Sequence, residues 1–380
     1  MKKTYDIAVL GGTAAGYVAA EALAKKGHSV VVLARPPAYA IAVQTESLLA
    51  DWIPSEIFKI RPFLQKVKSA ATDLPFRAVH FHSANLNRHA VYRSRSMLGF
   101  TLLQPRLLGT LALAARQAGV RCIRLKQGVE IDLQETSVVL NEIASPPREF
   151  RADVLLIADG RPSEVMNRLA MPQRETPAGQ LTICELTVPL RSPEQKSMDK
   201  DVHIVAFAGG ERFGMFFQGG GGLHVRIINL VKTGSHSAEE LVGFTGKIQR
   251  AGLVPESLNL SKASAGLWRP PGGAALEMDT HTAKRTLLIG TAGGFASAMT
   301  GATLAPSILS ALVAADVADR ALRSDLLQET LSEFEDQWRD TLADRIRPPG
   351  TSLQMMLPMA LTNKAMTARF AKAFLNGENI

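Results

Sequence analysis

The segment that most constrains the fold is YDIAVLGGTAAGYVAAEALAKKGHSVVVLAR, residues 5–35. An apolar run at 6–10 leads into a glycine-rich turn at 11–16, then into helix-forming residues at 17–26 and a second apolar run at 29–33. This order predicts a strand, a tight turn, a helix and a second strand. Such a βαβ unit presents backbone N–H groups at a helix N-terminus to a phosphate, so the segment predicts a dinucleotide-binding domain.

Two glycines of this turn have defined roles in the motif. Gly11 is expected to form the tight turn, and Gly16 to let the helix pack closely against the strand. Gly12 and Ala15 lie between them, and Thr13 takes the place of the usual middle glycine. A diphosphate is therefore expected to approach the backbone less closely at Thr13. In the plainer interpretation, the glycines only pack an α/β layer.

The end of the second strand departs from the usual pattern. A carboxylate commonly stands there and binds a ribose hydroxyl, but this chain has Ala34 followed by Arg35. Two interpretations of the arginine stay open. It accommodates a ribose 2′-phosphate, which favours NADP, or it caps the strand end in solvent.

Composition bounds the class of protein. A chain of 380 residues with 46% hydrophobic residues suits one large or two interlocked domains with a full core. The net charge of +8 suits anionic ligands. Because the basic residues are spread along the chain with few aromatic residues near them, nucleic-acid binding is not expected.

Two further features bear on location. The only two cysteines, Cys122 and Cys184, lie in apolar strand-like settings. They predict buried thiols in a reducing compartment, and the short apolar run after Met1 predicts no signal peptide, so we expect a cytoplasmic protein. The tract 286–315 carries no charge, but glycines and Pro306 divide it. We therefore expect a buried strand, loop and helix there rather than a membrane span.

The rest of the chain divides by pattern. A helix is expected at 48–58 and paired strands at 77–92, and a strongly apolar strand at 152–158 leads into Asp159 and Gly160. Short alternating strands begin near residue 173, and helices dominate after residue 306. The predicted domains are residues 1–172 with 280–325, an inserted antiparallel sheet at 173–279, and a C-terminal helical segment at 326–380.

The last helical segment, 359–375, has Met366, Phe370 and Phe374 on one face and basic residues elsewhere. This pattern favours docking on the core, with peripheral membrane contact as the alternative. His80 and His82 share one face of a strand because alternate residues point the same way. With no third ligand evident nearby, the sequence favours sheet filling, and no metal site is predicted.

Three ordered segments resemble the three fingerprints of the large FAD-dependent group that contains aromatic hydroxylases, geranylgeranyl reductases and flavin-dependent halogenases. The fingerprints are LGGTAAG at 10–16, ADVLLIADGRPSEV at 152–165 and LLIGTAGGFASAMTGATLAPSI at 287–308. QTESLL at 44–49, FGMFFQGGGGLHVRI at 213–227 and LTNKAMTARFAKAFL at 361–375 look most like the geranylgeranyl reductase and halogenase branch.

The resemblance implies an α/β fold: a Rossmann-like FAD-binding domain with an inserted antiparallel β-sheet substrate domain and C-terminal helices. It also implies a set of cofactor-binding positions: Gly11, Gly12, Thr13, Ala15, Gly16, Ala34, Arg35, Arg106, Asp159, Gly160, Gly290, Thr291, Gly294, Gly301, Ala302 and Thr303. Thr13, Ala34 and Thr291 replace residues that usually contact FAD, so the fingerprints are altered and weak FAD binding is expected.

The function implied is that of an FAD-dependent oxidoreductase, a monooxygenase or reductase with halogenation also open, acting on an apolar or aromatic small molecule. The expected substrate pocket comprises Met215, Phe217, His224 and Trp268. Weak catalytic candidates are His224 and, for halogenation, Lys66 and Lys68. NAD(P)H would supply electrons directly or through a flavin reductase partner. In the alternative, the chain has lost tight FAD binding and acts as a non-redox catalyst or a binding subunit.

Overall fold

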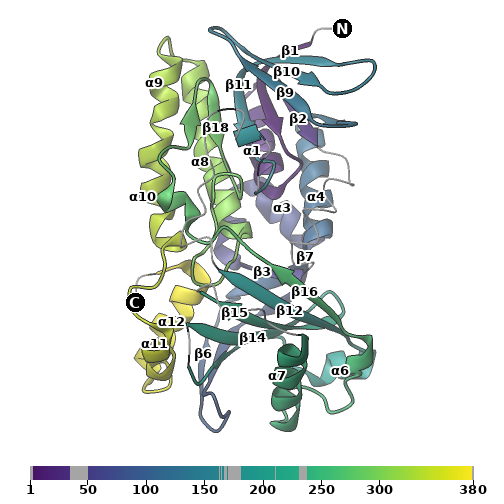
Figure 1. Ribbon diagram of the computed structural model, residues 1–380, viewed down its shortest axis with the longest axis vertical. Coiled ribbons are helices and arrows are strands. Elements are labelled where there is room, and N and C mark those ends of the chain that lie inside the picture. The colour runs from purple at the N-terminus through teal and green to yellow at the C-terminus, as the bar shows by residue number, and fades with distance from the viewer. Residues whose placement is uncertain are drawn as a thin grey trace.

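The computed structural model describes residues 3–34, 50–161, 163, 165, 166, 169, 181–209, 211–230 and 238–378. A mixed sheet with its helices forms the upper part of the molecule in Figure 1 and an antiparallel sheet forms the lower part, while C-terminal helices run along one side. The predicted α/β fold class is confirmed. Arg35 and the segment 44–49 lie outside the described residues.

The upper sheet contains the predicted βαβ unit. Its strands are β1 (Lys3–Leu10), β2 (Val30–Ala34), β8 (Arg121–Arg124), β9 (Val129–Leu133), β10 (Val138–Glu142), β11 (Glu149–Ile157), β17 (Thr282–Ala283) and β18 (Thr286–Leu288). The strands β18, β11, β1, β2 and β8 are parallel neighbours in that order. The side chains of β1 from Ile7 to Leu10 are fully buried, as expected for a parallel strand covered on both faces.

Helices pack against one face of this sheet and share a core with it. They are α1 (Ala14–Lys25), α3 (Pro62–Ala71), α4 (Gln104–Gln117) and α8 (Leu304–Leu322). Helix α8 is rich in alanine, and Ala311, Ala314 and Ala315 are fully buried. The uncharged tract 286–315 is therefore a buried strand, loop and helix, as predicted. No helix within the described ranges is both long and apolar enough to cross a bilayer.

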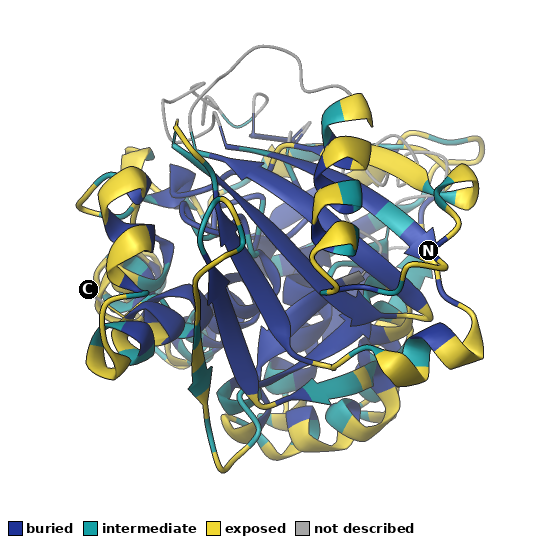
Figure 2. Ribbon diagram, turned by 90° about the horizontal axis from the view of Figure 1, so that it is seen from below, coloured by how far each residue is buried: buried dark blue, intermediate teal, exposed yellow. Residues whose placement is uncertain are grey.

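The lower sheet has the strand order β16-β12-β15-β14-β13-β5-β6. Its strands are β5 (Ala78–His82), β6 (His89–Arg93), β12 (Thr182–Pro189), β13 (Val202–Ala206), β14 (Arg212–Gly219), β15 (Gly222–Asn229) and β16 (Ser264–Trp268). The hairpin β5–β6 precedes the other strands by about a hundred residues, and β5 joins β13 in parallel. Figure 2 shows these strands buried and the outer faces of nearby helices exposed.

The lower sheet has two distinct faces. One carries Phe81, Ile204, Phe213 and Met215 and packs towards the upper part of the molecule. The other carries residues such as Phe216 and is covered by α7 (Ala238–Arg250), while α6 (Ser192–Ser197) lies in the connection between β12 and β13. The tight turn between β14 and β15 uses Gly220 and Gly221 at positive φ, which explains the middle two of the four consecutive glycines.

The helix predicted at 48–58 is wrong. The described part forms β3 (Ala50–Pro54) and a short 3₁₀ helix at Ser55–Lys59. Strand β3 pairs with β7 (Gly99–Leu103), which also pairs with β4 (Thr72–Phe76). Trp52 and Ile53 favour a strand, and Pro54 cannot donate the backbone hydrogen bond that a continuing helix needs.

The C-terminal segment contains α9 (Leu327–Ser332), α10 (Phe334–Ile346), α11 (Leu353–Met359) and α12 (Lys364–Asn376). Helix α12 docks on the lower sheet. The ring of Phe374 lies 5.8 Å from that of Phe81 and 5.3 Å from that of Phe213. Phe370 and Phe374 are 0% and 4% exposed. The apolar face of this helix, for which docking was favoured and membrane contact was the alternative, is therefore covered by the protein itself.

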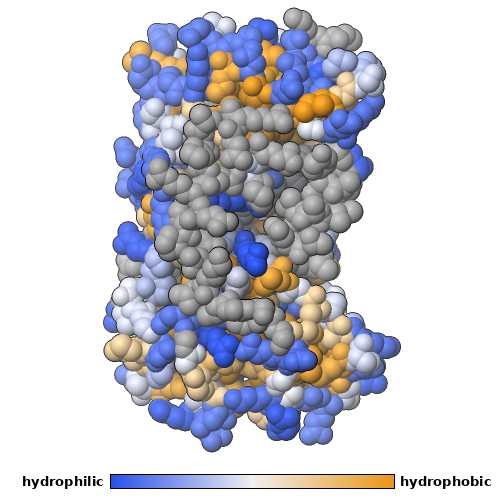
Figure 3. Space-filling view, in the orientation of Figure 1, coloured by the Kyte–Doolittle hydropathy of each residue, from blue (hydrophilic) through white to orange (hydrophobic). Residues whose placement is uncertain are grey.

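The described surface carries single apolar side chains rather than one continuous apolar face. On the side shown in Figure 3, hydrophobic residues appear in patches among hydrophilic ones near the two ends of the molecule. Met355 and Met359, on successive turns of α11, are 64% and 42% exposed. Isolated exposed residues of this kind are normal for folded proteins and indicate no particular partner.

Candidate functional site

The carboxyl ends of four parallel strands meet at one edge of the upper sheet. The amide of Gly11 donates to the carbonyl of Leu33 at 2.9 Å, and the amide of Ala158 donates to the carbonyl of Leu10 at 2.8 Å. The amide of Ile289 continues the row by donating to Ile157 at 2.9 Å. In open α/β sheets the ligand site lies beyond this edge.

The first fingerprint leaves no room for side chains at two of its glycines. Gly11 has φ of +123°, and a Cβ there would lie 2.2 Å from the carbonyl oxygen of Ala158. A Cβ on Gly16 would lie 2.2 Å from the carbonyl oxygen of Gly11. Both contacts are with backbone, which cannot move away. The structure thus supports the turn and packing roles that the sequence predicts for these glycines.

Thr13 connects the first fingerprint to the second. As the N-cap of α1, its hydroxyl oxygen accepts a hydrogen bond from the amide of Gly16 at 3.2 Å. The same hydroxyl donates to the carbonyl of Ala158 at 2.8 Å. Asp159, which follows, is buried, and its carboxylate accepts a hydrogen bond of 3.1 Å from Ser163. Gly160 then turns the chain with φ of +93°.

The third fingerprint packs against the first. Gly290 has φ of +62°, and a Cβ there would lie 2.7 Å from the Cβ of Ala15. Its amide donates to the hydroxyl of Ser310 in α8 at 3.0 Å. The carbonyl of Thr291 accepts a hydrogen bond of 3.0 Å from the amide of Gly294. The three segments therefore form one contiguous structure at the sheet edge.

The same loop also reaches the lower sheet. A Cβ on Gly301 would lie 2.6 Å from the Cδ1 atom of Ile183 in β12. Ala302 lines a small cavity of about 20 Å³ together with Trp52 and Thr300, which is room for one water molecule. Thr303 is the N-cap residue of α8 and is buried. The start of this helix thus lies between the upper and lower sheets.

Tyr17 lies beside the first fingerprint, a feature that the sequence did not reveal. A Cβ on Gly12 would lie 2.9 Å from the Tyr17 hydroxyl oxygen and 2.9 Å from the Cβ of Ala34. Burial, together with the nearby Cys122, raises the pKa of this phenol. The phenol therefore stands next to the strand end where a ribose-binding carboxylate is expected. An aromatic residue directly after Gly16 was the available signal.

Three other candidates lie on helices α3 and α4. Arg106 is exposed in the first turn of α4. Lys66 is exposed on α3, and the Lys68 ammonium lies 5.1 Å from the centre of the Phe100 ring. Among the described residues, no polar contact joins either lysine to the predicted pocket residues.

The four predicted pocket residues share one face of the lower sheet. Phe217 pairs with His224 across β14 and β15, and their rings stack at 5.3 Å. Met215 has the same orientation as Phe217, and strand register places Trp268 on this face too. All four are at most 9% exposed. The structure therefore brings the predicted residues together on the side that faces the third fingerprint.

This face also holds a buried charged network that the sequence analysis missed. The Arg226 guanidinium donates to Glu185 at 2.5 Å and to Asp51 at 3.4 Å, and it lies 4.7 Å from the centre of the Phe217 ring. The Nδ1 atom of His224 lies 3.4 Å from Glu185. The sequence signal for this network was the presence of Glu185 and Arg226 within the apolar runs of β12 and β15.

The pKa values of the two acids of the network shift in opposite directions. Burial opposes the ionisation of Glu185, but Arg226 and His224 outweigh it and lower the pKa of this carboxyl to about 2. Burial raises the pKa of Asp51, although Arg226 opposes the shift. The Oδ2 atom of Asp51 has no hydrogen-bond partner among the described residues. The shorter contact and the lowered pKa of Glu185 identify Arg226 and Glu185 as the main ion pair of the network.

The histidines of β5 are not alone on their face, so the expectation of no nearby third ligand is wrong. His80 and His82 lie with His89, and His80 also lies with Asp199 and His203, at spacings that suit metal ligation. The additional ligands come from β6, from β13 and from the connection before it. Asp199 and His203 are more than a hundred residues from β5, so the sequence could not reveal them, but His89 lies within the predicted strand pair at 77–92 and was an available signal.

Residues 5–210 match the sequence profile of the pyridine nucleotide-disulphide oxidoreductase family, which is more than half of the chain. The chain belongs to this family. Its two cysteines are not paired with each other: Cys122 lies in β8 and Cys184 in β12.

A curated relative is digeranylgeranylglycerophospholipid reductase 2 of Methanothermobacter thermautotrophicus, 24% identical over 90% of this chain and 85% of the relative. The fold is shared with a geranylgeranyl bacteriochlorophyll reductase-like protein of Thermoplasma acidophilum at 15% identity, covering 100% of this chain and 98% of that one, with a TM-score of 0.75.

Two further structures share the fold. One is the flavin-dependent halogenase CmlS, at 15% identity over 90% of this chain and 63% of that one, with a TM-score of 0.68. The other is p-nitrophenol 4-monooxygenase from Pseudomonas putida, at 15% identity over 100% of both chains, with a TM-score of 0.68. The resemblance to the FAD-dependent group noted from the sequence is confirmed.

Proposed function

We propose that this chain is an FAD-dependent reductase that reduces a carbon–carbon double bond of an apolar small molecule. The observation that carries the proposal is the convergence of the three fingerprints at one sheet edge, next to an apolar face of the lower sheet. Gly11 and Gly290 mark this convergence, because each contacts another fingerprint too closely for a side chain. The membership of an oxidoreductase family supports the redox assignment.

The residues at the sheet edge fit the cofactor in their backbone geometry. The first turn of α1 presents amides beside Gly12 and Ala15, which suits a diphosphate. The Tyr17 hydroxyl stands beside Ala34 and would take the place of the missing carboxylate as a partner for ribose. The N-terminus of α8, after Thr303, suits a partial negative charge. When bound, FAD supplies the hydride-transfer chemistry.

The lower sheet supplies what a reductase needs besides a hydride. Met215, Phe217 and Trp268 offer an apolar surface for a substrate without charge. Asp51 is buried, and its carboxyl group contacts Arg226 on the face that carries Met215 and Phe217. We assign Asp51 as the source of the proton that must reach the second carbon of the double bond.

The relatives favour reduction over the two other reactions. The curated relative and the structure with a TM-score of 0.75 are both named as reductases or reductase-like proteins. For halogenation a lysine beside the pocket would be needed, and neither the exposed Lys66 nor Lys68 above Phe100 contacts the pocket residues. The two cysteines are unpaired and lie in different sheets, so they do not form a disulfide that could pass electrons to FAD. We therefore propose NAD(P)H, acting directly or through a partner reductase, as the electron donor.

The experiment combines FAD-loaded protein, a chemical reductant and candidate substrates under anaerobic conditions. Polyprenyl compounds are compared with phenols, and the products are weighed by mass spectrometry. A gain of two hydrogens in the polyprenyl compound is expected, and Asp51→Asn should slow this step at least tenfold without weakening FAD binding. The same mixtures are also run in air: a gain of one oxygen by the phenol there, with polyprenyl compounds unchanged in both sets of reactions, would refute the proposal.

One observation favours a second function, that of a binding protein or non-redox catalyst with the same fold. The Thr13 side chain bonds the amide of Gly16 at the N-terminus of α1, and Tyr17 lies against Gly12. Both side chains occupy space that a dinucleotide approaches. A protein that binds polyprenyl compounds with unchanged affinity in the presence and absence of FAD would support this second function.

A further inference from the structure

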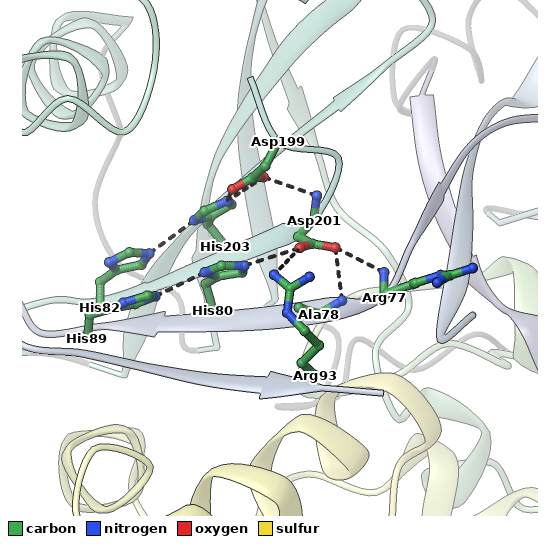
Figure 4. Close-up of polar contacts among 9 residues, drawn as sticks. All are labelled: Arg77, Ala78, His80, His82, His89, Arg93, Asp199, Asp201 and His203. Carbon is green, nitrogen blue, oxygen red and sulfur yellow. Dashed lines mark hydrogen bonds and ion pairs between the residues drawn. The ribbon is translucent and has the colours of Figure 1, made fainter. Parts of the chain in front are cut away.

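Four histidines meet on the face of the lower sheet that is turned away from the predicted substrate pocket. His80 pairs with His203 across β5 and β13, and His82 pairs with His89 across β5 and β6. Their side chains lie on the same face as Phe216, whose ring stacks on His203 at 4.3 Å. The chain has eight histidines in all. Half of them therefore meet at this one place (Figure 4).

Two carboxylates fix the protonation of two of these rings. The Nε2 atom of His203 lies 2.9 Å from Asp199, and that of His80 lies 3.3 Å from Asp201. Because a carboxylate only accepts hydrogen bonds, each Nε2 atom carries the proton in the neutral ring. Each Nδ1 atom then has a lone pair directed towards another histidine. Carboxylate–histidine pairs of this kind orient the ligands of metal sites.

The lone pairs face the remaining two rings. The Nδ1 atom of His80 lies 3.0 Å from Nε2 of His89, and that of His203 lies 3.0 Å from Nε2 of His82. In a tetrahedral site with metal–nitrogen bonds of about 2.0–2.1 Å, neighbouring ligand nitrogens lie about 3.3–3.4 Å apart. The nitrogen atoms of each pair are thus a few tenths of an ångström closer than two ligands of one ion. One hydrogen-bonding proton lies between them, and the ion would replace it.

Burial and access suit an ion that exchanges slowly with solvent. His80, His82 and His203 are at most 8% exposed, whereas His89 and Asp199 are exposed. Neutral imidazole is the form that binds metal ions.

We propose that His80, His82, His89 and His203 bind one divalent transition-metal ion of the zinc class, with Asp199 and Asp201 as orienting groups. Imidazole ligands without thiolates suit zinc, copper and nickel rather than calcium or magnesium. The rings lie within 19° of parallel, and parallel rings do not direct their nitrogens to one tetrahedral centre. The rings would therefore rotate about their side-chain bonds when the ion binds. The exposed ring of His89 is the one freest to do so.

The position of the ion suggests a structural role. His80 and His82 belong to the hairpin strand β5, whereas His203 belongs to β13 of the inserted sheet. The ion would cross-link two segments that are more than a hundred residues apart, at their only parallel strand pair within the described sheet. Binding to the folded state alone raises the temperature of unfolding. The site is separate from the proposed reductase function and does not depend on it.

The test uses the full, untagged chain, stripped with a chelator and titrated with Zn²⁺ by calorimetry. The variants are His89→Gln, which keeps a hydrogen-bonding group at an exposed position, and Asp199→Asn, which removes an orienting carboxylate. Val91→Thr serves as the matched control, because Val91 is an exposed residue of the same strand. Thermal unfolding with and without Zn²⁺ checks that every variant is folded.

One ion per chain is expected to bind to the wild type and to Val91→Thr, and to raise the unfolding temperature of both. His89→Gln should weaken Zn²⁺ binding at least tenfold, and Asp199→Asn by about ten- to a hundredfold. Wild-type protein that binds no Zn²⁺ would overturn the proposal. So would equal binding by the wild type and both cluster variants, because the ion would then lie elsewhere.

Discussion

The hydroxyl of Thr13 donates a hydrogen bond of 2.8 Å to the carbonyl oxygen of Ala158, 145 residues further along the chain. The same oxygen accepts the amide of Gly16 and so caps helix α1. One side chain therefore joins the first and second fingerprints and holds the helix whose N-terminus faces the proposed cofactor. The replacement of the usual middle glycine is thus part of the structure of the site.

Substitution of Thr13 should separate stability from cofactor binding. Thr13→Ala removes the cap and the bond to Ala158, and we expect a loss of about 1–2 kcal/mol in the free energy of unfolding. Thr13→Ser keeps both hydrogen bonds and should behave as the wild type. Thr13→Gly restores the usual motif and should bind FAD more tightly. Denaturant unfolding and FAD titration measure the two effects, and weaker FAD binding by Thr13→Gly would contradict this account.

Gly290→Ala tests the contact between the third and first fingerprints. The new Cβ would lie 2.7 Å from the Cβ of Ala15, at φ of +62°. Gly27 is the matched control, because it has φ of +97° and nothing within 4 Å of an added Cβ. Gly27→Ala should cost about 1–2 kcal/mol from backbone strain alone. Gly290→Ala should cost a further 1–3 kcal/mol, as is typical for overpacking, and should weaken FAD binding.

These two alanine variants are compared by chemical denaturation and by FAD titration. Equal losses of stability would mean that the contact with Ala15 relaxes without cost, against the expectation for a packed fingerprint junction. Unchanged FAD affinity in Gly290→Ala would show that the contact between Gly290 and Ala15 does not contribute to FAD binding.

Arg226→Met tests the buried charged network. It leaves the Glu185 carboxylate, with a pKa of about 2, buried without its guanidinium partner. Removal of one member of a buried ion pair typically costs about 3–5 kcal/mol. The double variant with Glu185→Met should recover most of this loss, because neither charge of the Arg226–Glu185 pair remains buried. Urea unfolding of the single and double variants gives the coupling, and a double variant less stable than Arg226→Met would disprove the ion-pair assignment.

Glu335 predicts a stability change at acid pH. Burial opposes its ionisation, but hydrogen bonds from His281 outweigh this and lower the pKa of the Glu335 carboxyl to about 2. In the unfolded chain the pKa is about 4.3. Because the folded pKa is the lower one, the stabilisation is complete above about pH 5 and is lost as the pH falls towards 2.

The variant Glu335→Gln removes this titration. The free energy of unfolding of the wild type should exceed that of Glu335→Gln by on the order of 2–3 kcal/mol near pH 6. The difference should shrink as the pH falls below about 4. Urea unfolding across this pH range measures it, and a difference that is constant with pH would show that the carboxylate is not selectively stabilised in the folded state.

The sequence predicted the elements whose pattern is local. The run from Asp6 to Leu33 gave the βαβ unit because apolar periods and glycines are close together along the chain. The four glycines at 219–222 likewise indicated the hairpin of β14 and β15. The helix predicted at 48–58 failed because β3 is stabilised by β7, a partner about fifty residues away that no local pattern indicates.

The candidate site divides in the same way. The fingerprint glycines could be found from their spacing, since each is needed for a turn or a close backbone contact within a short segment. Tyr17 beside Ala34, the contact of Asp51 with Arg226 and the meeting of His80 with His203 depend on register between distant strands. Such contacts are set by tertiary pairing, so a single sequence does not disclose them.

The central claim is that the three fingerprints hold FAD, and the most direct measurement is the visible absorption spectrum of the purified protein followed by an FAD titration. We expect a yellow protein, or saturable quenching of flavin fluorescence by the colourless protein at micromolar concentration. The Gly16→Val variant, whose side chain would meet the backbone of Gly11, should lose this binding. A folded wild-type protein that stays colourless and indifferent to millimolar FAD would contradict the account.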